Sequence, residues 1–196
     1  MRLLARIFLL LKGFFLSLLL VACSTMPQQL AVPRSVSSTI YAADAGYHIL
    51  MGETAIQRGD YFIAAQEYFA AAEISEDPEI AQRATQHAYD YGYAVYMFSA
   101  SRRWIELDPK SPDANSYLGM AYLGERNASQ AFRYFDQSMP PLEDRSESDY
   151  LFLESKMALV GSYSTIVYVL QRFLDRYPYQ PGIHLALANA AMRAGD

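Results

Sequence analysis

Residues 112–135 read PDANSYLGMAYLGERNASQAFRYF, and this stretch decides the fold that the sequence predicts. In it a Leu-Gly pair is followed by Tyr after three residues, by Ala after nine more and by Phe after another four. Working outward, residues 52–61 and 187–196 are helical runs that both close on a Gly-Asp pair. The chain is therefore expected to repeat one helical unit. The residues that set the pattern are Leu118, Gly119, Tyr122, Ala131 and Phe135.

The spacing of these features has a nearly constant period. A unit that begins at Pro112 has counterparts 34 residues earlier at Pro78 and a further 33 residues earlier at Ala45. Later units begin at Glu147 and near Pro181. Because one helical hairpin cannot bury its apolar face alone, five units in register predict an array in which each hairpin stacks on the next.

This pattern resembles the tetratricopeptide repeat, a 34-residue helix–turn–helix unit with Leu-Gly, Tyr, Ala and Phe at these offsets. The resemblance covers about residues 45–196 and implies an all-α, right-handed superhelix of about four repeats plus one extra helix. Small residues in each unit let its two helices approach closely, while Tyr and Phe fill the space between units. The second and fourth units depart from the pattern, with large residues where small ones are usual: Met97, Trp104, Glu154, Ile166 and Phe173.

The fifth unit holds only its first helix. Its run from Ile183 to Met192 is apolar around most of the helix, whereas a terminal repeat needs a polar outer face. We therefore expect another helix to cover it, either from a partner or from a longer chain, and a truncated chain is slightly favoured.

Residues 1–22 are predicted to be a secretory signal. They contain 17 apolar residues, and their basic residues precede an uninterrupted apolar stretch, Phe14–Ala22. A membrane helix is disfavoured, because this stretch is far shorter than the ~20 residues that span a bilayer. Lys12 also lies inside the candidate span.

The signal ends in Leu20-Val21-Ala22-Cys23, which holds the only cysteine of the chain. This tetrapeptide resembles the lipobox of bacterial lipoproteins, and the resemblance implies that Cys23 becomes a lipid-modified N-terminus. Ser24 follows it, which implies the periplasmic face of the outer membrane, with the inner membrane as the weaker alternative. A free or metal-binding cysteine is the other interpretation. Residues 23–40 are then expected to be a flexible tether, and residues 41–196 the repeat domain.

Composition excludes several classes of function. The 21 acidic and 16 basic residues give a formal net charge of −5, which argues against a nucleic-acid partner. One cysteine allows no intramolecular disulfide and no Cys-rich metal site. His48, His87 and His184 fall in three different units, and the sequence has no metal-ligand, nucleophile or phosphate-loop motif. We therefore expect no enzyme, cofactor or metal.

The family binds peptides or protein segments on a concave face lined by the first helix of each unit. Carried over to this chain, the resemblance implies a polar groove, slightly acidic in its N-terminal half and more apolar later; some of these positions could instead be merely exposed. The candidate groove residues are Glu53, Gln57, Gln82, Gln86, Tyr89, Asp90, Ser116, Met120, Ser155, Asn189 and Arg193, and the apolar residues at equivalent positions include Leu123 and Leu159.

Three other features each have two interpretations. Tyr89, Tyr91, Tyr93 and Tyr96 could form an aromatic box, but packing between units is favoured. Residues 140–149 are acidic and widen the third junction; they lack the glycine and spacing of a calcium loop, so a solvated linker is favoured. Arg102-Arg103-Trp104 could hold an anionic partner, but a buried Trp with solvated Arg is favoured.

The leading hypothesis is a lipid-anchored, non-catalytic scaffold that binds protein partners in the periplasm. Such a scaffold would assist assembly of a secretin, pilus or outer-membrane protein complex. The alternatives are an adaptor or regulator of a cell-wall or polysaccharide enzyme, and the N-terminal part of a longer repeat protein.

Overall fold

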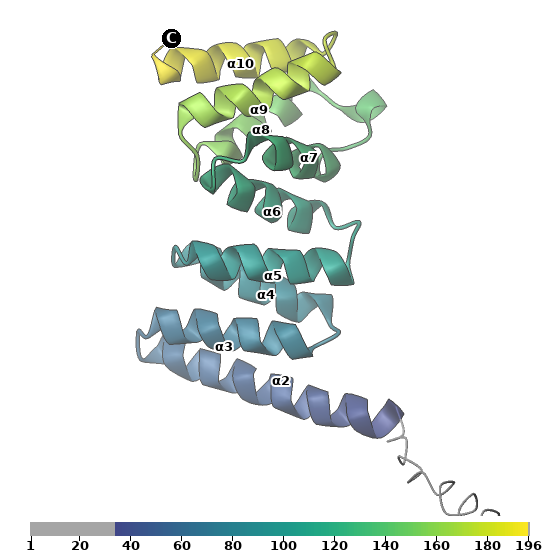
Figure 1. The fold of residues 1–196 in the computed structure, drawn as a ribbon, viewed down its shortest axis with the longest axis vertical. Helices are drawn as coiled ribbons and strands as arrows, with labels where there is room; N and C mark the ends of the chain where they lie inside the picture. Colours follow the sequence, from purple (N-terminus) through teal and green to yellow (C-terminus); the bar gives the residue numbers. More distant parts are fainter. Residues whose placement is uncertain (1–33, 196) are drawn as a thin grey trace, which may run out of the picture. The chain divides into compact units, whose positions relative to one another are not determined.

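The computed structural model describes residues 34–195, with side chains from residue 44 onward. Residues 38–196 form one compact unit, separate from residues 1–37. The described residues form α-helices joined by short turns, together with one short 3-10 helix and no strand, and Figure 1 shows the helices following one another along a stack. The predicted all-α fold of stacked helical hairpins is confirmed. The helices are α2 (Arg34–Gln57), α3 (Tyr61–Ile74), α4 (Pro78–Asp90), α5 (Ala94–Leu107), α6 (Pro112–Gly124), α7 (Ala128–Ser138), η1 (Leu142–Asp144), α8 (Glu147–Met157), α9 (Tyr163–Arg176) and α10 (Pro181–Ala194).

The predicted repeat register is confirmed in four units, because α4, α6, α8 and α10 begin at the residues where the units were expected to begin. The first unit differs. Its helix α2 begins at Arg34, so residues 34–40, the end of the expected tether, are helical. The expected signal at 1–22, Cys23 and the rest of the tether lie outside the described residues.

Local chemistry explains two of the confirmed helix starts. The side chain of Asp77 accepts a hydrogen bond from the backbone N–H of Glu79 at 2.9 Å, and that of Ser111 accepts one from Ala114 at 3.2 Å. In both cases proline is the next residue, at the first helical position, where no backbone N–H is needed.

Three hairpins close on the same turn. The N–H of Gly59 reaches the carbonyl of Ile56, and the N–H of the next residue reaches the carbonyl five residues back, the pattern that ends many helices in a left-handed residue. Gly92 and Arg126 repeat this pattern 33 and 34 residues further on. Their φ angles are +77°, +76° and +58°, so Arg126 occupies a left-handed position that the other two turns give to glycine.

Small residues allow close helix packing in the third unit. A Cβ atom on Gly119 of α6 would lie 2.7 Å from the Phe135 ring of α7, which is fully buried. The large residues of the second and fourth units are also accommodated in the core, because Met97, Trp104, Glu154, Ile166 and Phe173 are all buried.

The Arg102-Arg103-Trp104 segment is structural in part. Trp104 is 4% exposed, as the favoured interpretation requires. Arg103, however, is not simply solvated, because its guanidinium donates to the carbonyl oxygens of Ala72 and Ser75 at the end of α3, at 3.2 and 2.8 Å. It thus satisfies helix-terminal carbonyls that have no partner within the helix.

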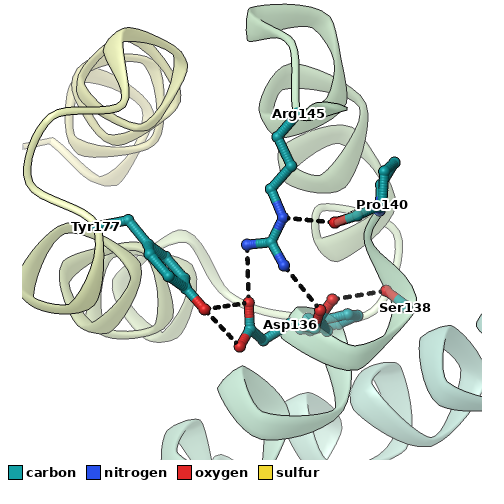
Figure 2. Close-up of polar contacts among 6 residues, drawn as sticks. Asp136, Ser138, Pro140, Arg145 and Tyr177 are labelled. Carbon is teal, nitrogen blue, oxygen red and sulfur yellow. Dashed lines mark hydrogen bonds and ion pairs between the residues drawn. The ribbon is translucent and has the colours of Figure 1, made fainter. Parts of the chain in front are cut away.

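The junction before α8 is not only a solvated linker. Its 3-10 helix is exposed, but the side chain of Arg145 is just 6% exposed and points back into the stack. Figure 2 shows its guanidinium between Asp136 at the end of α7 and the carbonyl of Pro140. The expectation of a solvated segment was therefore wrong for Arg145.

The last helix, α10, packs one face on α8 and α9. Ile183, Ala186 and Ala190 are buried, while Leu185 and Met192 are 40% and 70% exposed. Over the part of the chain that the structure describes, no helix has the length and apolar character needed to cross a membrane.

Candidate functional site

A cleft of about 690 Å³ lies where α4, α6 and α8 end. We call it the central cleft. The end of α4, the first half of α5, the end of α6 and the turn between α8 and α9 line it. It is large enough to receive several side chains of a partner. Its lining residues are Ala88, Tyr89, Asp90, Gly92, Ala94, Val95, Met97, Phe98, Ser99, Met120, Ala121, Gly124, Glu125, Leu159 and Val160.

Much of the lining is apolar. Met97, Met120 and Ala121 are buried among the helices behind the cleft. Val95 and Leu159 also line the cleft but remain 77% and 67% exposed, which is unusual for large apolar side chains that have helices nearby to pack on. Neighbouring exposed apolar side chains are typical of interaction sites, and methionine adapts its shape to different ligands.

The ionisable groups of the cleft lining are acidic. Asp90 is the last residue of α4, and Glu125 follows the last residue of α6; both are exposed, and neither makes an ion pair with the described side chains. Both carboxylates lie at helix C-termini, where the helix dipole is already negative, whereas the N-terminus of α5 contributes an opposing partial positive charge. The net field at the cleft mouth therefore favours a cation.

The structure brings three of the eleven candidate groove residues together in this cleft. Tyr89, Asp90 and Met120 line it, and Leu159 from the same set of repeat positions joins them. Tyr89 also meets the ring of Tyr117 edge-on, with centroids 5.5 Å apart. Ser116 lies outside the cleft: it is buried and accepts a hydrogen bond from Lys156 at 3.2 Å.

The candidates nearer the N-terminal end lie around an aromatic stack. Glu53 accepts the hydroxyl of Tyr68 and lies 3.9 Å from Arg83. The Tyr68 ring stacks on His87 at 4.3 Å, and burial together with Glu53 raises the pKa of that tyrosine. Burial lowers the pKa of His87, although Glu53 and Asp90 oppose the shift. The neighbouring candidates Gln57, Gln82 and Gln86 are exposed or half-buried, with no side-chain partner among the described residues.

The candidates at the other end are partly engaged within the chain. Arg193 donates to the hydroxyl of Tyr163 at 2.7 Å and lies 3.7 Å from the buried carboxylate of Glu154. Ser155 donates to the carbonyl of Phe152 and remains exposed, and Asn189 is half-buried. These residues do not converge on one cavity.

The tyrosines of the second unit pack between helices, as the favoured interpretation held. Tyr91 stacks on Tyr61 at 4.1 Å, and Tyr93 and Tyr96 both contact Phe62 edge-on. Because these rings face different aromatic partners, they form no box around a common space.

Sequence reasoning missed the contribution of α5 to the cleft. Only first helices were assigned to the groove, yet five residues of α5 line the cavity. Val95 carried a usable signal, because Met97, Ala100 and Trp104 form the buried stripe of this helix and Val95 falls outside it.

The arrangement supports binding rather than catalysis. Among the described side chains, no group of three or more His, Cys, Asp or Glu could hold a metal ion. His48 pairs with Glu67 at 2.7 Å, and His184 reaches only the carbonyl of Pro178. No nucleophile lies beside either histidine in these contacts, as nucleophilic catalysis would require.

Comparisons with known proteins were made for the whole chain. No protein-family model and no curated protein matches it. One similar solved structure is described as "Crystal structure of MamA protein"; it has 16% sequence identity and a TM-score of 0.47, and the match covers 81% of this chain and 83% of that chain.

Proposed function

We infer that this protein is a non-catalytic scaffold that binds a protein partner in the central cleft. The observation that carries this inference is the convergence of exposed apolar side chains and unpaired carboxylates around one cavity. Aromatic, methionine and polar groups around a concave site are typical of peptide and protein recognition.

The cellular setting is part of the same proposal. The lipobox-like Leu20-Val21-Ala22-Cys23 supports lipid attachment at Cys23, and Ser24 supports the periplasmic face of the outer membrane. A repeat domain held there would bind a subunit of a secretin, pilus or outer-membrane protein machine during its assembly.

In-cell photocrosslinking tests the binding site. We would place p-benzoylphenylalanine at Val95 in the central cleft and at Gln171, an exposed residue of α9 outside the cleft lining. We expect a discrete crosslinked partner from position 95 and none of that size from position 171. The proposal fails if position 95 gives no discrete product, or if both positions give the same one.

A glycine substitution supplies the matched variant. A Cβ on Gly124, at the edge of the cleft, or on Gly46 in α2 would meet nothing within 4 Å, and neither residue has a positive φ. Gly124→Leu should therefore obstruct the cleft without disturbing the core, and the crosslink from Val95 should be lost. Gly46→Leu should leave it unchanged.

The anchor is tested separately by Cys23→Ala. The variant should lose lipid labelling and leave the membrane fraction, because stable anchoring requires acyl chains. A Cys23→Ala protein that still fractionates with membranes would overturn the anchoring proposal, while leaving the binding site untouched.

A further inference from the structure

We propose that the central cleft selects a partner segment in which a bulky apolar side chain lies beside a lysine or arginine. This inference rests on the proposed protein-binding function and deepens it by naming the chemistry of the partner. It is carried by the apolar lining and by the unpaired carboxylates of Asp90 and Glu125.

The apolar part of the ligand follows from the cavity. Val95 and Leu159 stay largely exposed, although both belong to the lining of a 690 Å³ space. An inserted leucine- or phenylalanine-sized group would remove their apolar surface from water, and this is the main favourable contribution to most protein association. Met97 and Met120 behind the cleft can adjust to the shape of that group.

The cationic part follows from where the carboxylates lie. Asp90 and Glu125 stand at helix C-terminal ends, where a negative charge is unfavourable to the helix itself. Structural need therefore does not account for them. No lysine or arginine lines the cleft; Arg126 is next to Glu125 in sequence but lies outside the lining. A partner cation would satisfy both carboxylates.

The same charges disfavour two other ligands. An anionic segment would meet the two carboxylates and the negative helix ends directly. A lipid acyl chain would fill the apolar space but leave both carboxylates without a counter-ion.

Selection from a displayed library of random 12-residue peptides tests the proposal. The target is the purified full-length protein in detergent micelles, as wild type and as the double variant Asp90→Lys/Glu125→Lys. Wild type should enrich peptides that pair a large apolar residue with Lys or Arg, and the double variant should enrich Asp or Glu in place of the cation. Thermal unfolding checks that the double variant is folded, and lysine at a helix C-terminus is itself favourable.

Affinity measurements on an enriched peptide quantify the charge effect. Asp90→Asn/Glu125→Gln should weaken its binding roughly tenfold, since each exposed ion pair contributes only a small increment. Added salt should weaken binding to wild type more than binding to this neutral variant. Gly124→Leu should weaken binding and Gly46→Leu should not.

Three outcomes would overturn the inference: no enrichment, enrichment without basic residues, or the same peptides selected by the charge-reversed variant. Enrichment of purely apolar peptides would instead indicate an acyl-chain site. If the Val95 crosslink is present and lost in Gly124→Leu while the library shows no basic preference, this inference fails and the scaffold function stands. An absent crosslink would count against the scaffold function itself.

Discussion

Arg145 and Asp136 join two parts of the stack that are nine residues apart in sequence but separated by an irregular junction. The Arg145 guanidinium donates to the carboxylate of Asp136 at 2.8 Å and to its backbone carbonyl at 3.2 Å. The Tyr177 hydroxyl at the end of α9 donates to the same carboxylate, and Arg145 lies over the Tyr177 ring at 5.0 Å (Figure 2). The ends of α7 and α9 and the residue that precedes α8 thus share one polar cluster.

Removing this arginine should destabilise the fold. Arg145→Ala leaves the Asp136 carboxylate and the Pro140 carbonyl without their donor, so we expect a loss of about 2–3 kcal/mol in the free energy of unfolding, less than for a fully buried pair. Urea denaturation of the purified protein measures the loss. Arg172→Ala on the exposed face of α9 is the control and should change stability by less than about 0.5 kcal/mol. Equal stability of the two variants would contradict a structural role for Arg145.

Gly119 should tolerate no side chain. An alanine there places its Cβ 2.7 Å from Cδ1 and 2.8 Å from Cε1 of the buried Phe135 ring, so we expect Gly119→Ala to cost about 1–3 kcal/mol. Gly124→Ala in the same helix meets nothing within 4 Å and should gain up to about 1 kcal/mol from helix propensity. Denaturation of the pair tests the packing, because helix propensity alone would stabilise both.

These helix contacts show which parts of the fold the sequence could predict. Four helix starts followed from a period of 34–35 residues and from prolines that are allowed at the first helical position. The start of α2 could not be predicted, because residues 34–40 contain Ser, Val and Thr, which are weak helix formers. Continuing an existing helix requires no new nucleus, so the chain can remain helical there despite weak propensity.

The site was less predictable, for a physical reason. Repeat positions indicated Tyr89, Asp90 and Met120 correctly as neighbours of one cavity, because helices in register repeat their faces. They could not show how far α5 opens beside α6, or that the turn at Leu159 closes the space. Those features depend on side-chain volumes in three units at once.

Arg126 holds a conformation that costs free energy. Its φ is +58°, where a side chain is disfavoured by about 1–2 kcal/mol, while the equivalent turns use Gly59 and Gly92. Arg126→Gly should therefore raise the free energy of unfolding, by about 0.5–1 kcal/mol after the greater chain entropy of glycine is subtracted. Gly92→Ala, the reverse change at an equivalent turn, should lower it. A stability loss in both variants would mean that the Arg126 side chain makes a contribution larger than the backbone strain.

The cleft carboxylates should reduce stability while serving binding. Asp90→Asn removes a negative charge from the C-terminal end of α4, and we expect a gain of about 0.3–1 kcal/mol. Glu79→Gln removes one from the first turn of the same helix, where it is favourable, and should lose a similar amount. Thermal unfolding at low ionic strength compares them. If Asp90→Asn is instead destabilising, the residue has a structural partner and the binding interpretation weakens.

The His87 stack should make stability depend on pH. Burial between neighbouring rings lowers the pKa of His87 in the folded state below its ordinary value of 6.5. As the pH falls below that value, the unfolded chain binds a proton that the folded protein does not, so the free energy of unfolding decreases until the folded pKa is reached.

A ring without a titrating group isolates this effect. His87→Phe keeps a ring for Tyr68 to stack on, and Tyr91→Phe keeps His87 itself. Between pH 7 and 5, wild type and Tyr91→Phe should lose stability together, while His87→Phe should follow a flatter curve. The measurement is urea denaturation at each pH, and parallel curves for wild type and His87→Phe would show that other groups carry the dependence. Because Glu53 and Asp90 favour the charged form of His87, removing either carboxylate should steepen the loss, since the folded pKa then falls further.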